Sequence, residues 1–231
     1  MNFAEAKDSI RLLIFDLDGT LIDSAADLAL SVNATLRYAG REPLDHATIF
    51  SYVGRGAPAL IRRALGEGAT QDELDDALHY FLTYYWDHKL DHTRLYPGVA
   101  ETLQQLANGT SRRILTVLTN KPENVSRSIL AGLGVGHLFR YIFGGNSFVT
   151  KKPDPLGIHK TLEKTGVPPA AAMMIGDSDV DIVTGTNAGV WTCGVTYGIG
   201  TLQLEKNPPH LLINSFPELQ TALEASGAAS E

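Results

Sequence analysis

The sequence predicts an α/β protein: a doubly wound parallel sheet core with an inserted all-helical unit. Short apolar runs alternate with helical patterns along most of the 231 residues, which is the order expected of parallel strands covered by helices. Residues 24–93 contain helical patterns and no convincing strand. We therefore divide the chain into an α/β core, residues 1–23 and 94–231, and a helical insert, residues 24–93.

The first expected strand is Arg11–Phe15, an apolar run that ends at Asp16. A short run that is apolar throughout is typical of a parallel strand buried on both faces. Further strands are expected at 114–118, 141–143, 172–175, 190–195 and 211–213.

The helices of the core are indicated by the residues at their ends, because proline favours the start of a helix and glycine its end. This pattern predicts helices over 97–107, 122–131, 153–165 and 178–188, and a last helix that begins at Pro217.

The insert is expected to hold four helices. The last of them begins at Thr70 and Glu73, which form a capping box. Two shorter helices are expected over 45–54 and 58–66, where glycines end them. The first and last helices carry apolar stripes at helical spacing, namely Leu28, Val32, Leu36 and Ala39 in the first and Leu74, Leu78, Phe81 and Tyr85 in the last.

Composition and charge exclude several classes of function. With 44% hydrophobic residues the chain can bury a large core. A net charge of -7 makes it a poor candidate for binding nucleic acid or an anionic membrane. The single cysteine, Cys193, excludes an intrachain disulfide framework. Residues 1–10 carry charges and no apolar stretch of signal-peptide length, so no signal peptide is expected there. We expect a cytoplasmic protein, a monomer or homodimer, that binds a small molecule.

The strongest local signal is the segment Asp16-Leu17-Asp18-Gly19-Thr20. It places two carboxylates just beyond the first strand, at the edge of an open α/β sheet where ligands bind. Taken alone, this segment could equally be an ordinary Asp/Gly turn.

Other polar residues follow two more of the predicted strands. Thr119 and Asn120 follow the strand at 114–118, and Asp177 follows the strand at 172–175, with Asp181 four residues later. The carboxyl ends of parallel strands share one edge, so these groups are expected to meet Asp16.

Clustered carboxylates repel one another unless a cation compensates them. Oxygen ligands favour a hard divalent cation, and Mg²⁺ is the natural choice. Lys152, which precedes Pro153, and Thr119 then remain to hold a phosphoryl group. Lys151 competes with Lys152 for that role.

As a set, these segments resemble the four motifs of the haloacid dehalogenase superfamily. The motifs are Asp16-x-Asp18-Gly-Thr20, Thr119-Asn120, Lys152-Pro153 and Gly176-Asp177-Ser178-x-x-Asp181, in the family's order and across nearly the whole chain. The resemblance implies a Rossmann-like core with a mobile helical cap, here residues 24–93. The segments 23–28 and 53–60 are similar to those of phosphoglycolate phosphatases in that superfamily.

The resemblance also implies a role for each motif residue. Asp16 would attack phosphorus and form an aspartyl phosphate, and Asp18 would be the general acid and base. Mg²⁺ would be held by Asp16, the backbone carbonyl of Asp18 and Asp177, with support from Asp181. Thr119, Asn120 and Lys152 would bind the phosphoryl group.

Arg55 is the candidate for substrate selection by the cap. It lies between Gly54 and Gly56, just before the helix that begins near Pro58. Glycines allow a close approach of the backbone, and a helix N-terminus favours an anion. Because many glycolate-type relatives carry Asn at this position, the choice of 2-phosphoglycolate stays open, and a solvated loop arginine is an equal alternative.

Several other functions share these motifs. A sugar phosphomutase uses all four of them, and pyrophosphate and nucleotide monophosphates are alternative substrates. A dehalogenase is disfavoured by Asp18, which that branch lacks. A phosphonate hydrolase needs a cap lysine, and the cap has only Lys89. A phosphoacceptor module of the receiver type is much shorter and has no helical insert.

Overall fold

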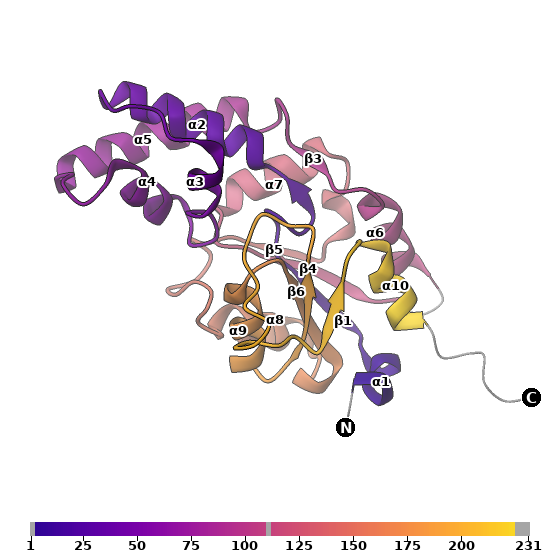
Figure 1. Cartoon of the computed structure of the whole chain (residues 1–231). Coiled ribbons are helices and arrows are strands. Elements are labelled where there is room, and N and C mark those ends of the chain that lie inside the picture. Colours follow the sequence, from indigo (N-terminus) through magenta and orange to yellow (C-terminus); the bar gives the residue numbers. More distant parts are fainter. Residues whose placement is uncertain (1–2, 110–111, 225–231) are drawn as a thin grey trace, which may run out of the picture.

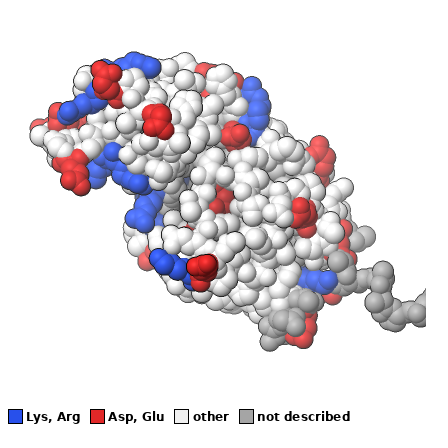
Figure 2. Space-filling model, in the orientation of Figure 1, with Lys and Arg blue, Asp and Glu red and all other residues white. Residues whose placement is uncertain are grey.

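The computed structural model describes residues 3–109 and 112–224 and has two parts (Figure 1). A parallel sheet flanked by helices forms the core, and four helices of the insert stand beside one end of it. Within these residues no helix is long and apolar enough to span a membrane. Figure 2 shows acidic and basic side chains scattered over one face, separated by uncharged surface.

The core sheet has six parallel strands in the order β5-β4-β1-β6-β7-β8, which confirms the predicted fold class. β1 lies at the centre, and from it the chain builds one side of the sheet and then the other. This reversal of direction marks the place where open α/β sheets bind ligands. The strands are β1 (Leu12–Phe15), β4 (Ile114–Leu118), β5 (Tyr141–Phe143), β6 (Ala172–Gly176), β7 (Trp191–Val195) and β8 (Leu211–Ile213).

The two faces of β1 contribute to different apolar cores. Leu13 and Phe15 belong to the core on one face, and Leu12 and Ile14 belong to the core on the other. Alternate side chains of a strand point to opposite faces, and all four are fully buried. The helices of the core are α1 (Phe3–Ala6), α6 (Val99–Asn108), α7 (Glu123–Gly132), α8 (Leu156–Thr165), α9 (Asp179–Asn187) and α10 (Pro217–Glu224).

The cap consists of α2 (Ala25–Tyr38), α3 (His46–Phe50), α4 (Ala57–Leu65) and α5 (Gln71–His88). The predicted capping box is present: the backbone N–H of Thr70 donates to Glu73, and that of Glu73 donates to the Thr70 hydroxyl.

One predicted helix is shorter than expected. The helix predicted over 45–54 ends at Phe50, because the N–H groups of Tyr52 and Val53 bond three residues back. Such bonds tighten the last turn of a helix instead of extending it.

The two connections between core and cap lie side by side. β2 (Ile22–Asp23) pairs antiparallel with β3 (Arg94–Leu95), and neither strand was predicted. The buried Asp27 carboxylate joins them further, since it accepts hydrogen bonds from the backbone N–H groups of His92 and Thr93 and from the Thr93 hydroxyl. The cap is thereby anchored where it leaves and rejoins the core.

Candidate active site

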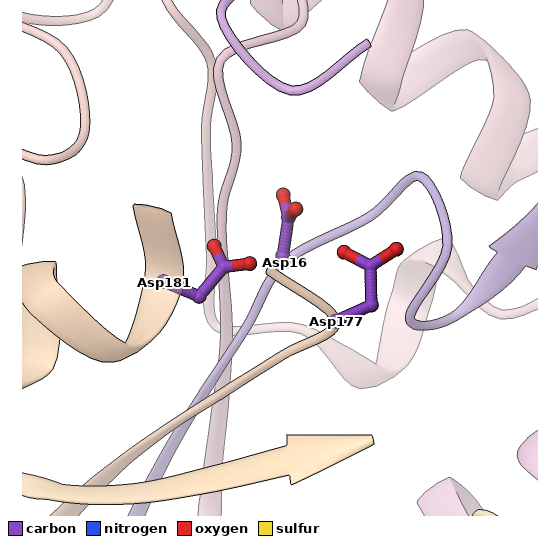
Figure 3. Close-up of side chains that lie close together, drawn as sticks. All are labelled: Asp16, Asp177 and Asp181. Carbon is purple, nitrogen blue, oxygen red and sulfur yellow. The ribbon is translucent and has the colours of Figure 1, made fainter. Parts of the chain in front are cut away.

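Three acidic side chains meet at the carboxyl edge of the sheet. Asp16 follows β1, Asp177 follows β6, and Asp181 lies in the first turn of α9. All three are buried, and one oxygen from each lies within 4.8 Å of the others (Figure 3). The sequence predicted this convergence.

Gly19 makes room for the cluster. Its φ is +80°, and a Cβ there would lie 1.9 Å from Asp177 Oδ2. That oxygen instead accepts hydrogen bonds from the backbone N–H groups of Ile199 and Gly200, at 2.9 and 2.7 Å. A side chain at position 19 would therefore displace the carboxylate that the cluster needs.

Burial and mutual repulsion make these carboxyl groups hard to ionise together. Burial raises the pKa of Asp16 to about 6; the nearby Lys152 opposes the rise, and Asp181 adds to it. The pKa of Asp177 is raised well above its ordinary value by burial and by the charges of Asp181 and Asp16. Ionisation of all three carboxyl groups together therefore requires more positive charge than Lys152 alone supplies.

Lys152 is the lysine that reaches the cluster. Its Nζ lies 2.8 Å from Asp16 Oδ1 and 2.6 Å from Asp181 Oδ1, whereas the adjacent Lys151 is exposed. The other oxygen of Asp181 accepts from the N–H and hydroxyl of Ser178. Ser178 and Lys152 therefore fix the Asp181 carboxylate in place, which suits the supporting role that was expected of Asp181 at the metal.

Thr119 and Asn120 occupy the end of β4, with different surroundings. Thr119 lines a cavity between the core and the cap. Its hydroxyl accepts a hydrogen bond from the backbone N–H of Lys121. The Asn120 side chain bonds both backbone groups of Lys152 and donates to the cap carbonyl of Gly54. Since the amide is used in this way, Asn120 orients Lys152 and the cap loop rather than offering its side chain to a substrate.

Asp18 has a partner, Lys121, that was not predicted from the sequence. Lys121 Nζ donates to both carboxylate oxygens of Asp18, at 2.8 and 3.0 Å, and the Ser24 hydroxyl also donates to Asp18. The available signal was the repeated lysine–proline pair: Lys121-Pro122 follows Thr119-Asn120 directly, just as Lys152-Pro153 forms the predicted phosphate-binding segment. Three site carboxylates therefore pair with two buried lysines: Asp18 with Lys121, and Asp16 and Asp181 with Lys152.

A cavity of about 60 Å³ lies between these loops and the cap. The core contributes Asp16, Asp18, Asp177, Thr119 and Lys121 among others, and the cap contributes mainly apolar side chains. The lining comprises Asp16, Asp18, Leu28, Val53, Gly54, Gly56, Ala57, Leu60, Phe81, Leu82, Tyr85, Thr119, Asn120, Lys121, Pro122, Val125, Asp177, Ser178, Ile199 and Gly200.

Arg55 does not line this cavity, and its contact with a substrate stays a prediction. Arg55 is exposed, and its glycine neighbours line the cavity in its place. Gly56 has a φ of +86°, and a Cβ there would lie 2.9 Å from the carbonyl oxygen of Asn120. The loop therefore meets the core through its backbone.

Comparison with known proteins gives the family. A family model described as haloacid dehalogenase-like hydrolase matches residues 13–195, which include the four site carboxylates and both buried lysines. This chain belongs to the haloacid dehalogenase-like hydrolases. The family match confirms the resemblance inferred from the motifs.

Several relatives within this family carry the same name. The phosphoglycolate phosphatase of Colwellia psychrerythraea is 39% identical over 220 residues, covering 92% of this chain and 96% of the relative. That of Vibrio cholerae is 40% identical over 198 residues, covering 82% and 86%. The crystal structure of a predicted phosphoglycolate phosphatase from Haemophilus somnus has a TM-score of 0.87 and 32% identity, covering 92% and 97%.

The acidic cluster of this hydrolase fits a divalent cation. Its available donors are carboxylate oxygens, which are ligands for hard cations. With Asp16, Asp177 and Asp181 ionised and Lys152 charged, the cluster has a formal charge of -2, which one divalent cation would neutralise.

Binding of a divalent cation is expected to release protons and to weaken at low pH. The pKa of Asp16 is raised to about 6, so below that pH the Asp16 side chain is mostly protonated in the metal-free protein. The proton then competes with the cation for the carboxylate. Calorimetric titrations in buffers of different ionisation enthalpy, at about pH 5 and about pH 8, measure both effects. Equal affinity at the two pH values, with no proton release, would contradict this account of the cluster.

Proposed function

We propose that the protein is a Mg²⁺-dependent phosphomonoester hydrolase that forms an aspartyl phosphate on Asp16 and acts on 2-phosphoglycolate or a similar small phosphate ester. The observation that carries the proposal is the placement of Asp16 and Asp18 on one cavity, each beside its own buried lysine. Two carboxylates with separate partners suit two separate roles.

In the first half-reaction a carboxylate oxygen of Asp16 bonds to phosphorus, and the bond from phosphorus to the ester oxygen breaks. The departing oxygen takes a proton from Asp18, so an alcohol leaves. Covalent catalysis of this kind splits one difficult hydrolysis into two easier steps. Lys152, 2.8 Å from Asp16, orients the nucleophile and offsets charge on the phosphoryl oxygens.

In the second half-reaction Asp18 accepts a proton from water as the water oxygen bonds to phosphorus. The bond from phosphorus to Asp16 then breaks, which yields inorganic phosphate and restores both carboxyl groups. Asp18 is held for this step by Lys121 and Ser24. A bound Mg²⁺, held by Asp16, Asp177 and the Asp18 carbonyl, would supply charge stabilisation to the phosphoryl group.

The size of the cavity supports a small leaving group. About 60 Å³ is bounded on the cap side by Leu60, Phe81 and Tyr85 among others. The glycolate moiety has only two carbon atoms. The names of the relatives from Colwellia psychrerythraea and Vibrio cholerae point to the same substrate.

A panel of phosphate esters tests this proposal. With Mg²⁺ we expect the highest kcat/KM for 2-phosphoglycolate among small acidic esters, lower values for hexose phosphates, pyrophosphate and nucleotides, and loss of turnover with a chelator. A clearly higher kcat/KM for a neutral sugar phosphate would overturn the substrate, and turnover that survives chelation would overturn the metal requirement.

A further inference from the structure

Lys121 is the one basic side chain among the described residues that line the cavity. Lys152 lies behind Asp16, and Arg55 and Lys151 are exposed. Any negative charge on the leaving group would therefore have to find its cation at Lys121.

Lys121 is fixed between the core and the cap. Its side chain is 5% exposed, its Nζ donates to both oxygens of Asp18, and the same Nζ lies 4.5 Å from the centre of the Tyr85 ring. Tyr85 belongs to α5 of the cap, and an ammonium over an aromatic face is attracted to it. Asp18 and Tyr85 together thus fix the position of this charge.

The surroundings of Lys121 favour its charged form despite burial. The ammonium is paired with the Asp18 carboxylate and lies over the face of the Tyr85 ring, and both contacts attract a positive charge. An ammonium has three N–H donors, and the contacts of Nζ with the two Asp18 oxygens leave at least one of them for a ligand.

We propose that Lys121 binds the anionic group of the leaving moiety and so determines specificity for small acidic phosphate esters. This inference rests on the proposed function, in which Asp18 lies beside the ester oxygen. Because Lys121 is bonded to Asp18, it also lies beside that oxygen. In 2-phosphoglycolate the carboxylate is one carbon away from the same oxygen.

The rest of the cavity strengthens the assignment. Apart from the Tyr85 hydroxyl, which is buried without a hydrogen-bond partner among the described residues, the cap side chains that line the cavity are apolar and offer no hydrogen bond to a carboxylate. A carboxylate buried against them without a partner would be strongly disfavoured. Contact with Lys121 therefore allows the enzyme to distinguish an acidic leaving group from a neutral leaving group of the same size.

The test compares two substrates that differ in charge, 2-phosphoglycolate and ethyl phosphate. Lys121→Met keeps the length of the side chain and removes the ammonium. The disturbance of Asp18 lowers kcat/KM for both esters, whereas the lost carboxylate contact lowers it for 2-phosphoglycolate alone. We expect the ratio of the two kcat/KM values to fall by about tenfold to a hundredfold.

Two further variants identify the responsible cation. Lys151→Met removes an exposed lysine outside the 60 Å³ cavity and should leave the ratio unchanged. Arg55→Met tests the rival cap residue. A fall in the ratio with Arg55→Met and none with Lys121→Met would overturn the proposal, as would equal losses on both substrates in Lys121→Met.

A measurement on the unaltered protein covers the case in which Lys121→Met does not fold. Binding of 3-phosphonopropionate, which keeps the carboxylate, is compared with binding of propylphosphonate, which lacks it. The acid should bind about tenfold to a hundredfold more tightly, and a crystal structure of its complex should place its carboxylate on Lys121 Nζ. Equal affinity, or a carboxylate bound elsewhere, would contradict the inference.

Failure of this inference differs from failure of the proposed function. A wild-type protein that hydrolyses both esters with an unchanged ratio in Lys121→Met retains the phosphatase mechanism and loses only the specificity residue. A wild-type protein that hydrolyses no phosphate ester overturns both.

Discussion

Asp16→Asn is expected to lower kcat for 2-phosphoglycolate by about 10⁴-fold or more, because an amide cannot form the acyl phosphate and the later steps depend on it. The side chain lies 2.8 Å from Lys152 and within the acidic cluster, where a neutral group reduces repulsion. We therefore expect the variant to fold. Steady-state turnover with Mg²⁺ tests the loss of activity, and thermal unfolding tests whether the variant is folded.

Asp72→Asn is a matched control, since Asp72 is an exposed acid in the first turn of α5. It should turn over like the unaltered protein. Because Asn can deamidate to Asp, the mass of the Asp16→Asn protein is checked after the assay. Comparable turnover in that variant, with its mass unchanged, would show that Asp16 is not the nucleophile.

Asp18→Asn should lower kcat by about 10² to 10⁴, the usual contribution of a general acid or base. An amide oxygen can still accept a hydrogen bond from Lys121, so the surroundings of residue 18 should be largely kept. The loss should be smaller for formation of the phosphoenzyme from an aryl phosphate than from an alkyl ester. An aryl oxide leaves readily without a proton, whereas an alkoxide does not.

Single-turnover measurements on the two classes of ester separate this role from a structural one. A purely structural defect would slow both esters by the same factor. Full wild-type activity in Asp18→Asn would place the acid and base at another residue.

The core of the fold could be predicted because each strand leaves a local signal. The apolar run before Asp16 and the capping box at Thr70 both depend on residues close together in the chain. The two-residue strands β2 and β3 carry no such pattern. They exist because the chain leaves and rejoins the core at one place, and pairing across the insert satisfies their backbone groups.

Site residues that directly follow a strand could be predicted from the sequence. A contact between residues that are far apart in the sequence could not. Asp16, Thr119 and Asp177 follow β1, β4 and β6, so the sheet itself brings them together. Lys121 lies 103 residues from Asp18 in the sequence, and the contact depends on how the loop after β4 turns. The direction of Arg55 also depends on the positive φ values of its glycine neighbours, which spacing alone does not reveal.

Rapid acid quench of Asp18→Asn mixed with an excess of an aryl phosphate and Mg²⁺ tests the central claim most directly. The aryl oxide leaves without a proton, so the phosphoenzyme should still form. Because no base activates the water, that phosphoenzyme should be hydrolysed slowly and should accumulate within the first turnover. Peptide mapping is expected to find one phosphoryl group, on Asp16, in an acyl phosphate that hydroxylamine removes. Phosphate on another residue, or turnover without a phosphorylated peptide at any quench time, would contradict the mechanism.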